Sequence, residues 1–240
     1  MLSYIQELMT MNNQIILTDF PKIECPFIRK NHPISKEQFQ DYRKKYNLRE
    51  SQLYLVTKEV NPGYEWVFAE PDTIAVEKLD GTNVKVLIEN KRIVHVQNRM
   101  NVIDLLSIES SKFQFSDGIF NAAGKGYFTA NGEYVGELLG PKINANHYKL
   151  PSHEWYPFER AISSLKYKSF NEHERTFENL STWFKNYLFS LFYAKKHNLP
   201  INEAIYAEGV VFYNLKRKAE NQWPYMAKLR RDMFDWYYQE

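Results

Sequence analysis

Three short stretches rich in β-branched residues follow one another from Thr73 onward, and they constrain the fold more than any other feature. The stretches are TIAVEKL, NVKVLIE and RIVHVQN, and the breaks between them are DGT and NK. Partial alternation of apolar and polar residues, interrupted by turn-forming residues, is typical of successive antiparallel strands. Asp80-Gly81 is also a common hairpin signal. We therefore expect an antiparallel sheet here, with a hairpin turn just after Lys78.

Other segments predict further strands and helices. EYVGELLG, ending at Gly140, and AIYAEGVVFY and YMAKLRR are strand-like, whereas SKEQFQDYRKKY and VIDLLSIESSKF favour helices. A longer helix, ended by Pro200, is predicted because large apolar residues recur at steps of three and four. These residues are Phe177, Leu180, Phe184, Leu188 and Leu191. The mixture predicts an α+β fold.

The chain of 240 residues is long enough to bury a core of its own. Residues 1–70, with scattered prolines, are expected to form a lead-in packed on the main domain, and residues 71–240 are expected to form that domain. No internal repeat, low-complexity tract or linker is found in the sequence. The chain ends soon after the last strand-like run, so no further C-terminal domain is expected.

Composition excludes several classes of protein. No apolar run approaches the length of a membrane span, and MLSYIQELMTMNNQ lacks the features of a secretory signal, so a cytoplasmic location is expected. Cys25 is the single cysteine, which excludes an internal disulfide and a thiolate zinc cage. The net charge of +2, from 31 basic and 29 acidic residues, argues neither for nor against nucleic acid as a partner.

Three familiar catalytic motifs do not fit. In GIFNAAGKG, five residues instead of four separate Gly118 from Gly124, so we expect a mobile glycine loop and no phosphate loop. His153-Glu154 is followed by Pro157 where a zinc protease needs a second histidine, and histidines of this kind are more often satisfied core or surface residues. No Gly-x-Ser-x-Gly elbow supports serine hydrolase chemistry.

Charged residues occur in strand-like runs where apolar or neutral residues would be ordinary. They are Lys78, Glu137, Glu208, Lys228 and Arg230. Each alone is explained more simply as part of a solvated strand face. Their order along the chain and their flanking residues change that balance.

EKLDGTN, GELLG, EGVVF and AKLRR, in this order, resemble the motifs of the covalent nucleotidyltransferases, which include ATP-dependent DNA and RNA ligases and mRNA capping enzymes. Asn83 after DGT, together with GELLG and KLRRDMF, is most similar to the small ATP-dependent RNA ligases. The resemblance covers about residues 70 to 235. It implies an adenylation domain of two antiparallel β-sheets with flanking helices and a ligand groove between them. Because the chain ends soon after AKLRR, the C-terminal OB-fold of DNA ligases and capping enzymes is not expected.

The resemblance makes Lys78 the nucleophile that bonds to the α-phosphorus of AMP. A free lysine has a pKa of ~10.4, so making the amine neutral at pH 7 costs roughly 4 to 5 kcal/mol if its surroundings do nothing. A bound Mg²⁺ or Mn²⁺ ion, together with Lys228 and Arg230, would lower that pKa and stabilise the α-phosphate and the departing pyrophosphate. One cluster of cations would thus serve activation of the nucleophile and stabilisation of the leaving group.

Other roles follow from the resemblance in the same way. Glu137 is implied to hold the ribose hydroxyls, Glu208 to place the metal, and Arg99 to lie near the ribose or the RNA phosphate. Glu77, Asp80, Gly81 and Asn83 complete the nucleotide-binding set of EKLDGTN, although Asp80 and Asn83 also fit plain turn chemistry. The aromatic residue that stacks on adenine is not defined; Trp155, Tyr156 and Phe158 are candidates, and core packing explains them equally well.

The expected function is that of an ATP-dependent RNA ligase. Lys78 takes AMP from ATP, the AMP passes to an RNA 5′-phosphate, and a 3′-hydroxyl then displaces it to seal the strand. Lys228, Arg230 and Arg99, with the basic run at 216–218, would contact phosphates. The expected partners are ATP and RNA ends, and the protein is expected to be a monomer. A DNA ligase, a GTP-using capping enzyme and a catalytically silent RNA-binding module remain alternatives, and the natural RNA substrate stays open.

Overall fold

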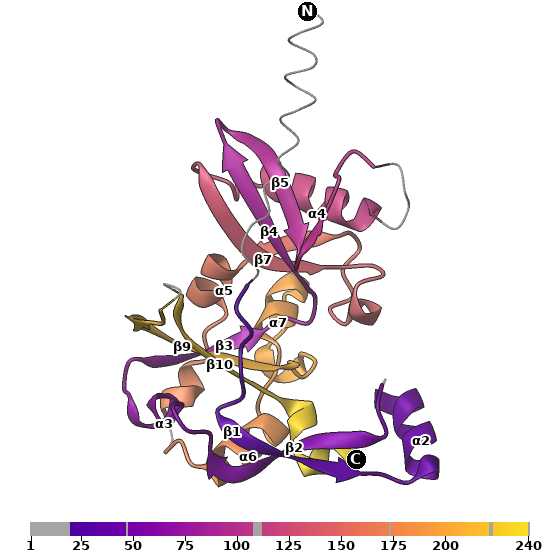
Figure 1. Cartoon of the computed structure of the whole chain (residues 1–240), viewed down its shortest axis with the longest axis vertical. Coiled ribbons are helices and arrows are strands. Elements are labelled where there is room, and N and C mark those ends of the chain that lie inside the picture. The colour runs from indigo at the N-terminus through magenta and orange to yellow at the C-terminus, as the bar shows by residue number, and fades with distance from the viewer. Residues whose placement is uncertain (1–19, 47, 108–111, 173, 221–222, 240) are drawn as a thin grey trace, which may run out of the picture. The chain divides into compact units, whose positions relative to one another are not determined.

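The structure is a computed structural model, and it describes residues 20–46, 48–107, 112–172, 174–220 and 223–239 (Figure 1). These residues form two compact units. Unit 1 consists of Phe20 with Gly81–Phe158, and unit 2 consists of Pro21–Asp80 with Glu159–Glu240. The boundary falls between Asp80 and Gly81, inside EKLDGTN. The expected division into residues 1–70 and 71–240 stays a prediction.

Unit 1 is built on a five-stranded antiparallel sheet with the order β6-β5-β4-β7-β8. Its elements are β4 (Thr82–Glu89), β5 (Arg92–Asn98), β6 (Asn101–Val102), α4 (Phe113–Gly124), β7 (Gly132–Leu139), η1 (Asn144–Asn146) and β8 (Glu154–Pro157). As predicted, NK forms the turn between β4 and β5, and both Asn90 and Lys91 have positive φ (50° and 62°), as the favoured two-residue hairpin turn requires. Val84, Val86 and Leu138 pack with α4 in the core.

The helix of unit 1 lies further along the chain than predicted. VIDLLSIESSKF was expected to be helical, but Val102 ends β6, residues 103–107 form no helix, and residues 108–111 lie outside the described part. The helix is α4, and it includes most of GIFNAAGKG, so the expectation of a glycine loop was wrong. Tertiary packing explains this: a Cβ on Gly118 would lie 2.2 Å from Leu138 Cδ1, so glycine lets the helix approach the sheet closely.

Unit 2 contains a three-stranded antiparallel sheet with the order β10-β9-β3 and a two-stranded sheet of β1 and β2. The strands are β1 (Phe27–Pro33), β2 (Gln52–Val60), β3 (Thr73–Lys78), β9 (Gly209–Lys218) and β10 (Pro224–Arg230). The α-helices are α2 (Lys36–Tyr46), α3 (Trp66–Ala69), α5 (Phe158–Ser164, at the unit boundary), α6 (Phe177–Asn186) and α7 (Leu191–His197). The short 3-10 helices are η2 (Lys168–Asn171), η3 (Ile201–Glu203), η4 (Arg231–Met233) and η5 (Asp235–Tyr238). One face of the β10-β9-β3 sheet contributes Ala75, Phe212 and Ala227 to an aromatic-rich core.

The predicted hairpin after Lys78 is wrong, because β3 and β4 belong to different sheets. β3 pairs with β9, and β4 pairs with β5 and β7. The free edge of β3 is used by another segment, since Glu77 N donates to Leu165 O and Tyr167 N donates to Ala75 O. Asp80-Gly81 therefore carries the chain from one sheet to the next, which local turn signals cannot distinguish from a hairpin.

The long helix predicted from Phe177 up to Pro200 is two helices, α6 and α7. Residues 187–190 leave the helical path because their backbone bonds with a later segment: Ser190 N donates to Ile205 O, and Ala207 N donates to Leu188 O. The Ser190 side chain then caps α7 by accepting from Tyr193 N. α7 ends at His197, and its C-cap Asn198 is left-handed (φ 52°), two residues before Pro200.

The remaining elements agree with an α+β fold of antiparallel sheets and helices. α2 lies where SKEQFQDYRKKY predicts it. β1 and β2 were not predicted. FIRKNHP lacks the apolar alternation of a half-buried strand, whereas in QLYLVTKEV the buried Leu53 and Leu55 flank the exposed Tyr54, a strand signal that was missed. Within the described ranges, no helix is long and apolar enough to cross a membrane.

Candidate active site

A row of residues crosses the β10-β9-β3 sheet of unit 2 and brings the predicted cations together. Gly209 on β9 is the register partner of Lys78 on β3 and of Arg230 on β10. Val211 likewise pairs with Val76 and with Lys228. Partners directly across a sheet share a face, and residues two apart on a strand do so as well. Lys78, Lys228 and Arg230 therefore share one face, opposite the face that forms the core.

Gly209 makes this row possible. A Cβ at position 209 would lie 2.2 Å from Leu229 O and 2.7 Å from the Arg230 Cα. No side chain fits at that point, so β10 approaches β9 closely, and no bulk stands between Lys78 and Arg230. The glycine of EGVVF thus has a packing reason that the sequence alone did not reveal.

Glu208, directly before Gly209, joins the two cationic strands. Lys78 Nζ lies 2.5 Å from Glu208 Oε2, and the two side chains are 23% and 21% exposed. Arg230 Nη1 lies 3.7 Å from Glu208 Oε1, and Arg230 Nη2 lies 3.0 Å from Asp232 Oδ2. Residues far apart in sequence therefore form one partly buried chain of alternating charge: Lys78, Glu208, Arg230 and Asp232.

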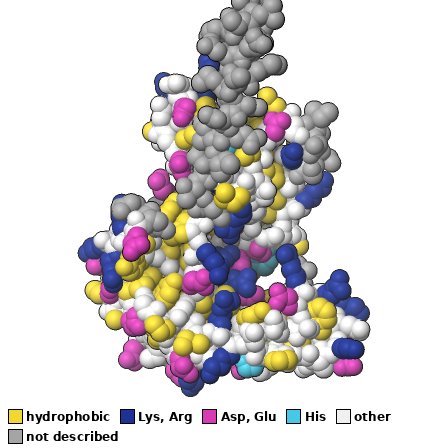
Figure 2. Space-filling view, viewed as in Figure 1, with side chains coloured by type: hydrophobic (Ala, Val, Ile, Leu, Met, Phe, Trp, Pro, Cys, Tyr) yellow, Lys and Arg dark blue, Asp and Glu magenta, His cyan; other side chains and the backbone are white. Residues whose placement is uncertain are grey.

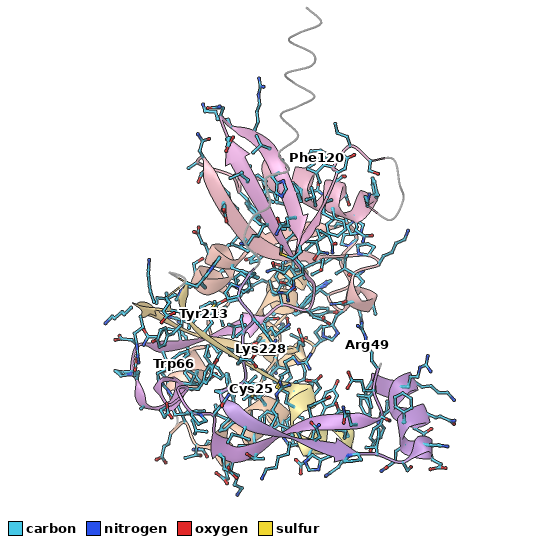
Figure 3. The ribbon with its side chains drawn as sticks, viewed as in Figure 1. Cys25, Arg49, Trp66, Phe120, Tyr213 and Lys228 are labelled. Atoms are coloured by element: carbon cyan, nitrogen blue, oxygen red, sulfur yellow. The ribbon has the colours of Figure 1, made fainter. Side chains whose placement is uncertain are left out.

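The electrostatics of this cluster reflect burial and crowding. Burial raises the pKa of Glu208, although the nearby charge of Lys78 opposes the shift. Burial lowers the pKa of Lys228, and repulsion from Lys78 and Arg230 lowers it further. Lys228 N also donates to Glu24 O, which holds β10 beside the segment that contains Cys25; both Lys228 and Cys25 are labelled in Figure 3.

Charged side chains of both signs lie next to one another on this part of unit 2. In the space-filling view, Lys and Arg side chains are interleaved with Asp and Glu side chains over the region of β1 and β10 (Figure 2). Such a surface offers cations to phosphate groups and carboxylates to a metal ion.

Asp232 is a site residue that sequence reasoning missed. Burial raises the pKa of its carboxyl group, and Arg230 opposes that shift. Within the described part of the chain, Asp232 Oδ1 and Arg230 Nε are buried and have no hydrogen-bond partner. Buried polar atoms of native proteins are normally paired. A carboxylate oxygen without a donor, next to an arginine N–H without an acceptor, therefore points to a ligand. The sequence contained one signal for this, an acid directly after two arginines in KLRRD.

These donors fit a hard divalent cation held partly by its substrate. Among the residues that the structure describes, no group of three His, Cys, Asp or Glu side chains could hold a metal ion. The carboxylates available at this site are those of Glu208 and Asp232, which both contact Arg230, so the protein would supply at most two metal ligands of this kind. Mg²⁺ is commonly bound by one or two carboxylates together with phosphate oxygens and water, so the residues present suit it.

Glu77 is placed differently from the nucleotide-binding role expected for it. Its side chain is 2% exposed and lies on the core side of β3, opposite Lys78. Its two oxygens accept hydrogen bonds from Ser190 Oγ (2.5 Å) and from Phe192 N (2.8 Å) at the start of α7. Burial raises the pKa of this carboxyl to about 7, and those bonds limit the rise. Glu77 therefore ties the strand of Lys78 to α7, and the structure does not bring its carboxylate to the charged face.

Unit 1 brings together a second group of predicted residues. Asn83 on β4 and Glu137 on β7 are register partners, and Tyr156 on β8 is the partner of Glu137 on its other side. A Cβ on Gly81 would lie 2.3 Å from Leu138 O and 2.7 Å from Glu137 Cγ, so glycine is required where the chain enters unit 1. Arg99 lies between β5 and β6 with φ 54°.

The aromatic candidates separate in the structure. Trp155 is fully buried in the core of unit 1, and its Nε1 donates to Val84 O, so it cannot stack on a ligand. Tyr156 is buried beside Glu137, and Phe158 contacts Phe20. Pro157 does not prevent the strand, because β8 lies at the edge of its sheet, where a missing N–H is tolerated.

His153 is a satisfied core histidine, as expected. It is 7% exposed, its Nδ1 lies 2.8 Å from Asp117 Oδ2, and its Nε2 lies 2.6 Å from Pro141 O. Both ring nitrogens are therefore occupied by the fold, and neither is available to a metal ion in this arrangement.

Comparison with known proteins adds a family. A family model described as RNA ligase matches residues 72–230. Naegleria gruberi RNA ligase with PPi is 17% identical, with a TM-score of 0.44, and the match covers 90% of this chain and 58% of that one. A mutant of the same ligase with ATP and Mn is 19% identical, with a TM-score of 0.43, and the match covers 70% of this chain and 51% of that one. The chain thus spans about half to three-fifths of the length of these structures. No curated protein sequence matches it.

The segment matched by the family model begins just before β3 and ends with β10. It contains EKLDGTN, GELLG, EGVVF and all of AKLR, and with them Lys78, Glu208, Lys228 and Arg230 of unit 2 and the residues that pair across β4 and β7. Since the match covers more than half of the chain, this protein belongs to the RNA ligase family.

Proposed function

We propose that this protein is an ATP-dependent RNA ligase that transfers AMP through a covalent bond to Lys78. One observation carries the proposal: Lys78 Nζ lies 2.5 Å from Glu208 on a sheet face that also carries Arg230 and Lys228. A protein that only binds RNA needs cations on its surface. It has no need to hold a lysine against a partly buried carboxylate next to two further cations.

In the first step, the neutral Lys78 amine attacks the α-phosphorus of ATP. The N–P bond forms, the bond between the α-phosphorus and the bridging oxygen breaks, and pyrophosphate leaves with the electron pair of that bond. The proton of the amine can pass to Glu208, which already accepts a hydrogen bond from it and whose pKa is raised by burial. Lys228 and Arg230 stabilise the negative charge of the phosphates.

Glu208 and Asp232 would hold the divalent ion. When bound, Mg²⁺ or Mn²⁺ would neutralise phosphate charge and favour the uncharged form of the nearby amine. In unit 1, Asn83 and Glu137 are proposed to bind the ribose and the later AMP–RNA intermediate, because a paired amide and carboxylate suit hydroxyl groups. Arg99 is proposed to contact a phosphate.

The later steps use the same phosphate-binding residues. AMP passes from Lys78 to the RNA 5′-phosphate, and the 3′-hydroxyl attacks that phosphate and releases AMP. Phosphate contacts carry no sequence information, so Lys228, Arg230 and the basic run at 216–218 would supply general RNA affinity that weakens with salt.

Intact-mass measurement tests the first step. The full chain is incubated with Mg²⁺ and either ATP or GTP, alongside Lys78→Ala and the control Lys58→Ala, an exposed lysine on β2 of the same unit. An adenylyl adduct on the wild type and on Lys58→Ala, but absent from Lys78→Ala, supports the proposal. A guanylyl adduct indicates capping chemistry, and absence of any adduct from the folded wild type refutes nucleotidyl transfer. Nicked duplex RNA, nicked DNA and single-stranded RNA then compete as strand substrates.

A further inference from the structure

A pocket of about 850 Å³ opens on unit 2, and its lining residues do not include Lys78, Glu208, Lys228 or Arg230. It is lined by parts of residues 164–172, 179–191 and 195–202, all within that unit. Its volume lies within the range of 300 to 1,000 Å³ typical of small-molecule sites, about the size that a nucleoside or two can occupy. Neither the motifs nor the proposed chemistry uses this pocket.

The pocket and its surroundings present aromatic rings to solvent. Tyr187, in the break between α6 and α7, lines the pocket and is 64% exposed. Phe189 also lines it and stacks on Tyr206, with ring centroids 4.9 Å apart and planes within 12° of parallel. Tyr206 is 41% exposed, and the Arg231 guanidinium lies 3.9 Å from the centroid of its ring. Arg231 is itself 6% exposed, so it packs on the Tyr206 ring and is not available to a ligand. Exposed rings such as that of Tyr187 are the means by which proteins stack unpaired bases.

The pocket is also positively charged. Among the residues that the structure describes, Lys166, Lys168 and Lys195 line it, and Glu172 is the one acidic residue that does so. Lys195 donates to Ser164 O, so its ammonium group is held at the rim. Lysines around an aromatic pocket favour a ligand that carries both a π-face and phosphate. An apolar peptide would gain nothing from three lysines.

A residue that lines the pocket pairs with the strand that carries Lys78. Lys166 forms a β-bridge with Val76, two residues before Lys78 on the same strand, or roughly 7 Å along it. Tyr206 is two residues before Glu208. An RNA strand whose end reacts at Lys78 would therefore need only a few nucleotides to place an unpaired base in the pocket.

We infer that this pocket binds an unpaired nucleotide of the RNA strand, stacked on Tyr187 and beside the Phe189–Tyr206 pair, with its phosphates on Lys166 and Lys168. The identity of the ligand as RNA rests on the proposed function. The pocket would make single-stranded RNA near the reacting end part of what the enzyme recognises.

The test measures binding of a fluorescent, 5′-phosphorylated single-stranded RNA by anisotropy over a series of salt concentrations. Tyr187→Ala is expected to weaken binding at least about fivefold, since loss of a stacked base costs ~1–3 kcal/mol, and Tyr187→Trp is expected to retain it. The double variant Lys166→Gln/Lys168→Gln is expected to reduce the slope of log K against log salt by about 1.4, from roughly 0.7 per lost phosphate contact. Lysyl-AMP formation is expected to stay at the wild-type level in all of them.

Tyr54→Ala and Lys36→Gln are matched controls, because both side chains are exposed, belong to the same unit and lie outside the pocket. RNA affinity and salt slope equal to those of the controls in the Tyr187→Ala and double-lysine variants overturn the inference; an apolar peptide site would give this result. Absence of the lysyl adduct from the wild type would sink the proposed chemistry separately, because the RNA-binding comparison needs no adduct.

Discussion

Glu77 offers the sharpest quantitative test of how the fold holds the proposed nucleophile. Its carboxyl is buried behind Lys78, on the core side of β3, and its pKa is raised to about 7 from an ordinary value of 4.5. Burial is the main cause, and the bonds from Ser190 and Phe192 oppose it. Between these two values the folded state holds a proton that the unfolded state has lost. The free energy of unfolding must therefore fall as the pH rises through this window.

The size of the effect follows from the shift. Each pH unit inside the window costs about 1.4 kcal/mol, and the contribution is fully present below pH 4.5 and lost above pH 7. Between pH 5 and pH 8, Glu77 alone should lower the free energy of unfolding by about 2 to 3 kcal/mol. In Glu77→Gln this component disappears, because an amide does not titrate. The free energy of unfolding of the variant, relative to that of the wild type, should therefore rise by that amount from pH 5 to pH 8.

Urea unfolding followed by tryptophan fluorescence, at constant ionic strength and at pH 5, 6, 7 and 8, measures the difference. Only the change of the difference with pH matters, since the cost of replacing the carboxyl by an amide is the same at every pH. Glu159→Gln, an exposed acid in the first turn of α5, is the control and should track the wild type. If the free energies of unfolding of Glu77→Gln and the wild type change with pH in parallel, Glu77 does not titrate in this window, and its buried contacts with Ser190 and Phe192 are not as described.

Three further predictions follow from the same contacts. In Gly209→Ala the new Cβ would lie 2.2 Å from Leu229 O, so urea titrations should show a free energy of unfolding that is lower by ~1–3 kcal/mol. Gly124→Ala is the control; its Cβ meets nothing within 4 Å, and the change should stay below about 1 kcal/mol. Equal effects of the two substitutions would contradict the close approach of β10 to β9. Asp232→Asn should raise the Mg²⁺ concentration for half-maximal lysyl-AMP formation at least about tenfold, as expected for a lost metal contact; an unchanged Mg²⁺ titration would remove Asp232 from the metal site. Cys25 is buried and its pKa is raised to about 11, so it should react with iodoacetamide at pH 8 only after the protein unfolds. Mass spectrometry measures the labelling, and a native protein that is labelled within minutes would argue against the burial of Cys25.

Local patterns predicted much of the secondary structure, and the motifs predicted the family. RIVHVQN matches β5 residue for residue, NK forms the expected turn, and α2 lies at SKEQFQDYRKKY. The motifs also named Lys78 and Glu208, which the structure joins at 2.5 Å. These features depend on neighbours in sequence, or on residue types that one reaction requires, so they are legible in the chain itself.

Features decided by distant contacts were mispredicted or missed. A periodic apolar pattern cannot show that residues 187–190 will bond with residues 205–207 instead of continuing a helix. A turn signal at Asp80-Gly81 cannot show that the strands on either side will join different sheets. The burial of Glu77 against α7 and the contact between Glu208 and Arg230 likewise depend on segments that are remote in sequence.

The amino-acid sequence by itself indicated most of the strand-forming segments from Thr73 onward and supplied the residue types that the proposed nucleotidyl transfer requires. Only the tertiary structure decided that β3 lies beside β9, that glycine at position 209 lets Arg230 and Lys78 share one face, and that Glu208 contacts both. The physical reason is that strand propensity and hydrophobic periodicity are local, whereas strand partners are chosen by backbone hydrogen bonds and core packing between residues that are far apart in the chain.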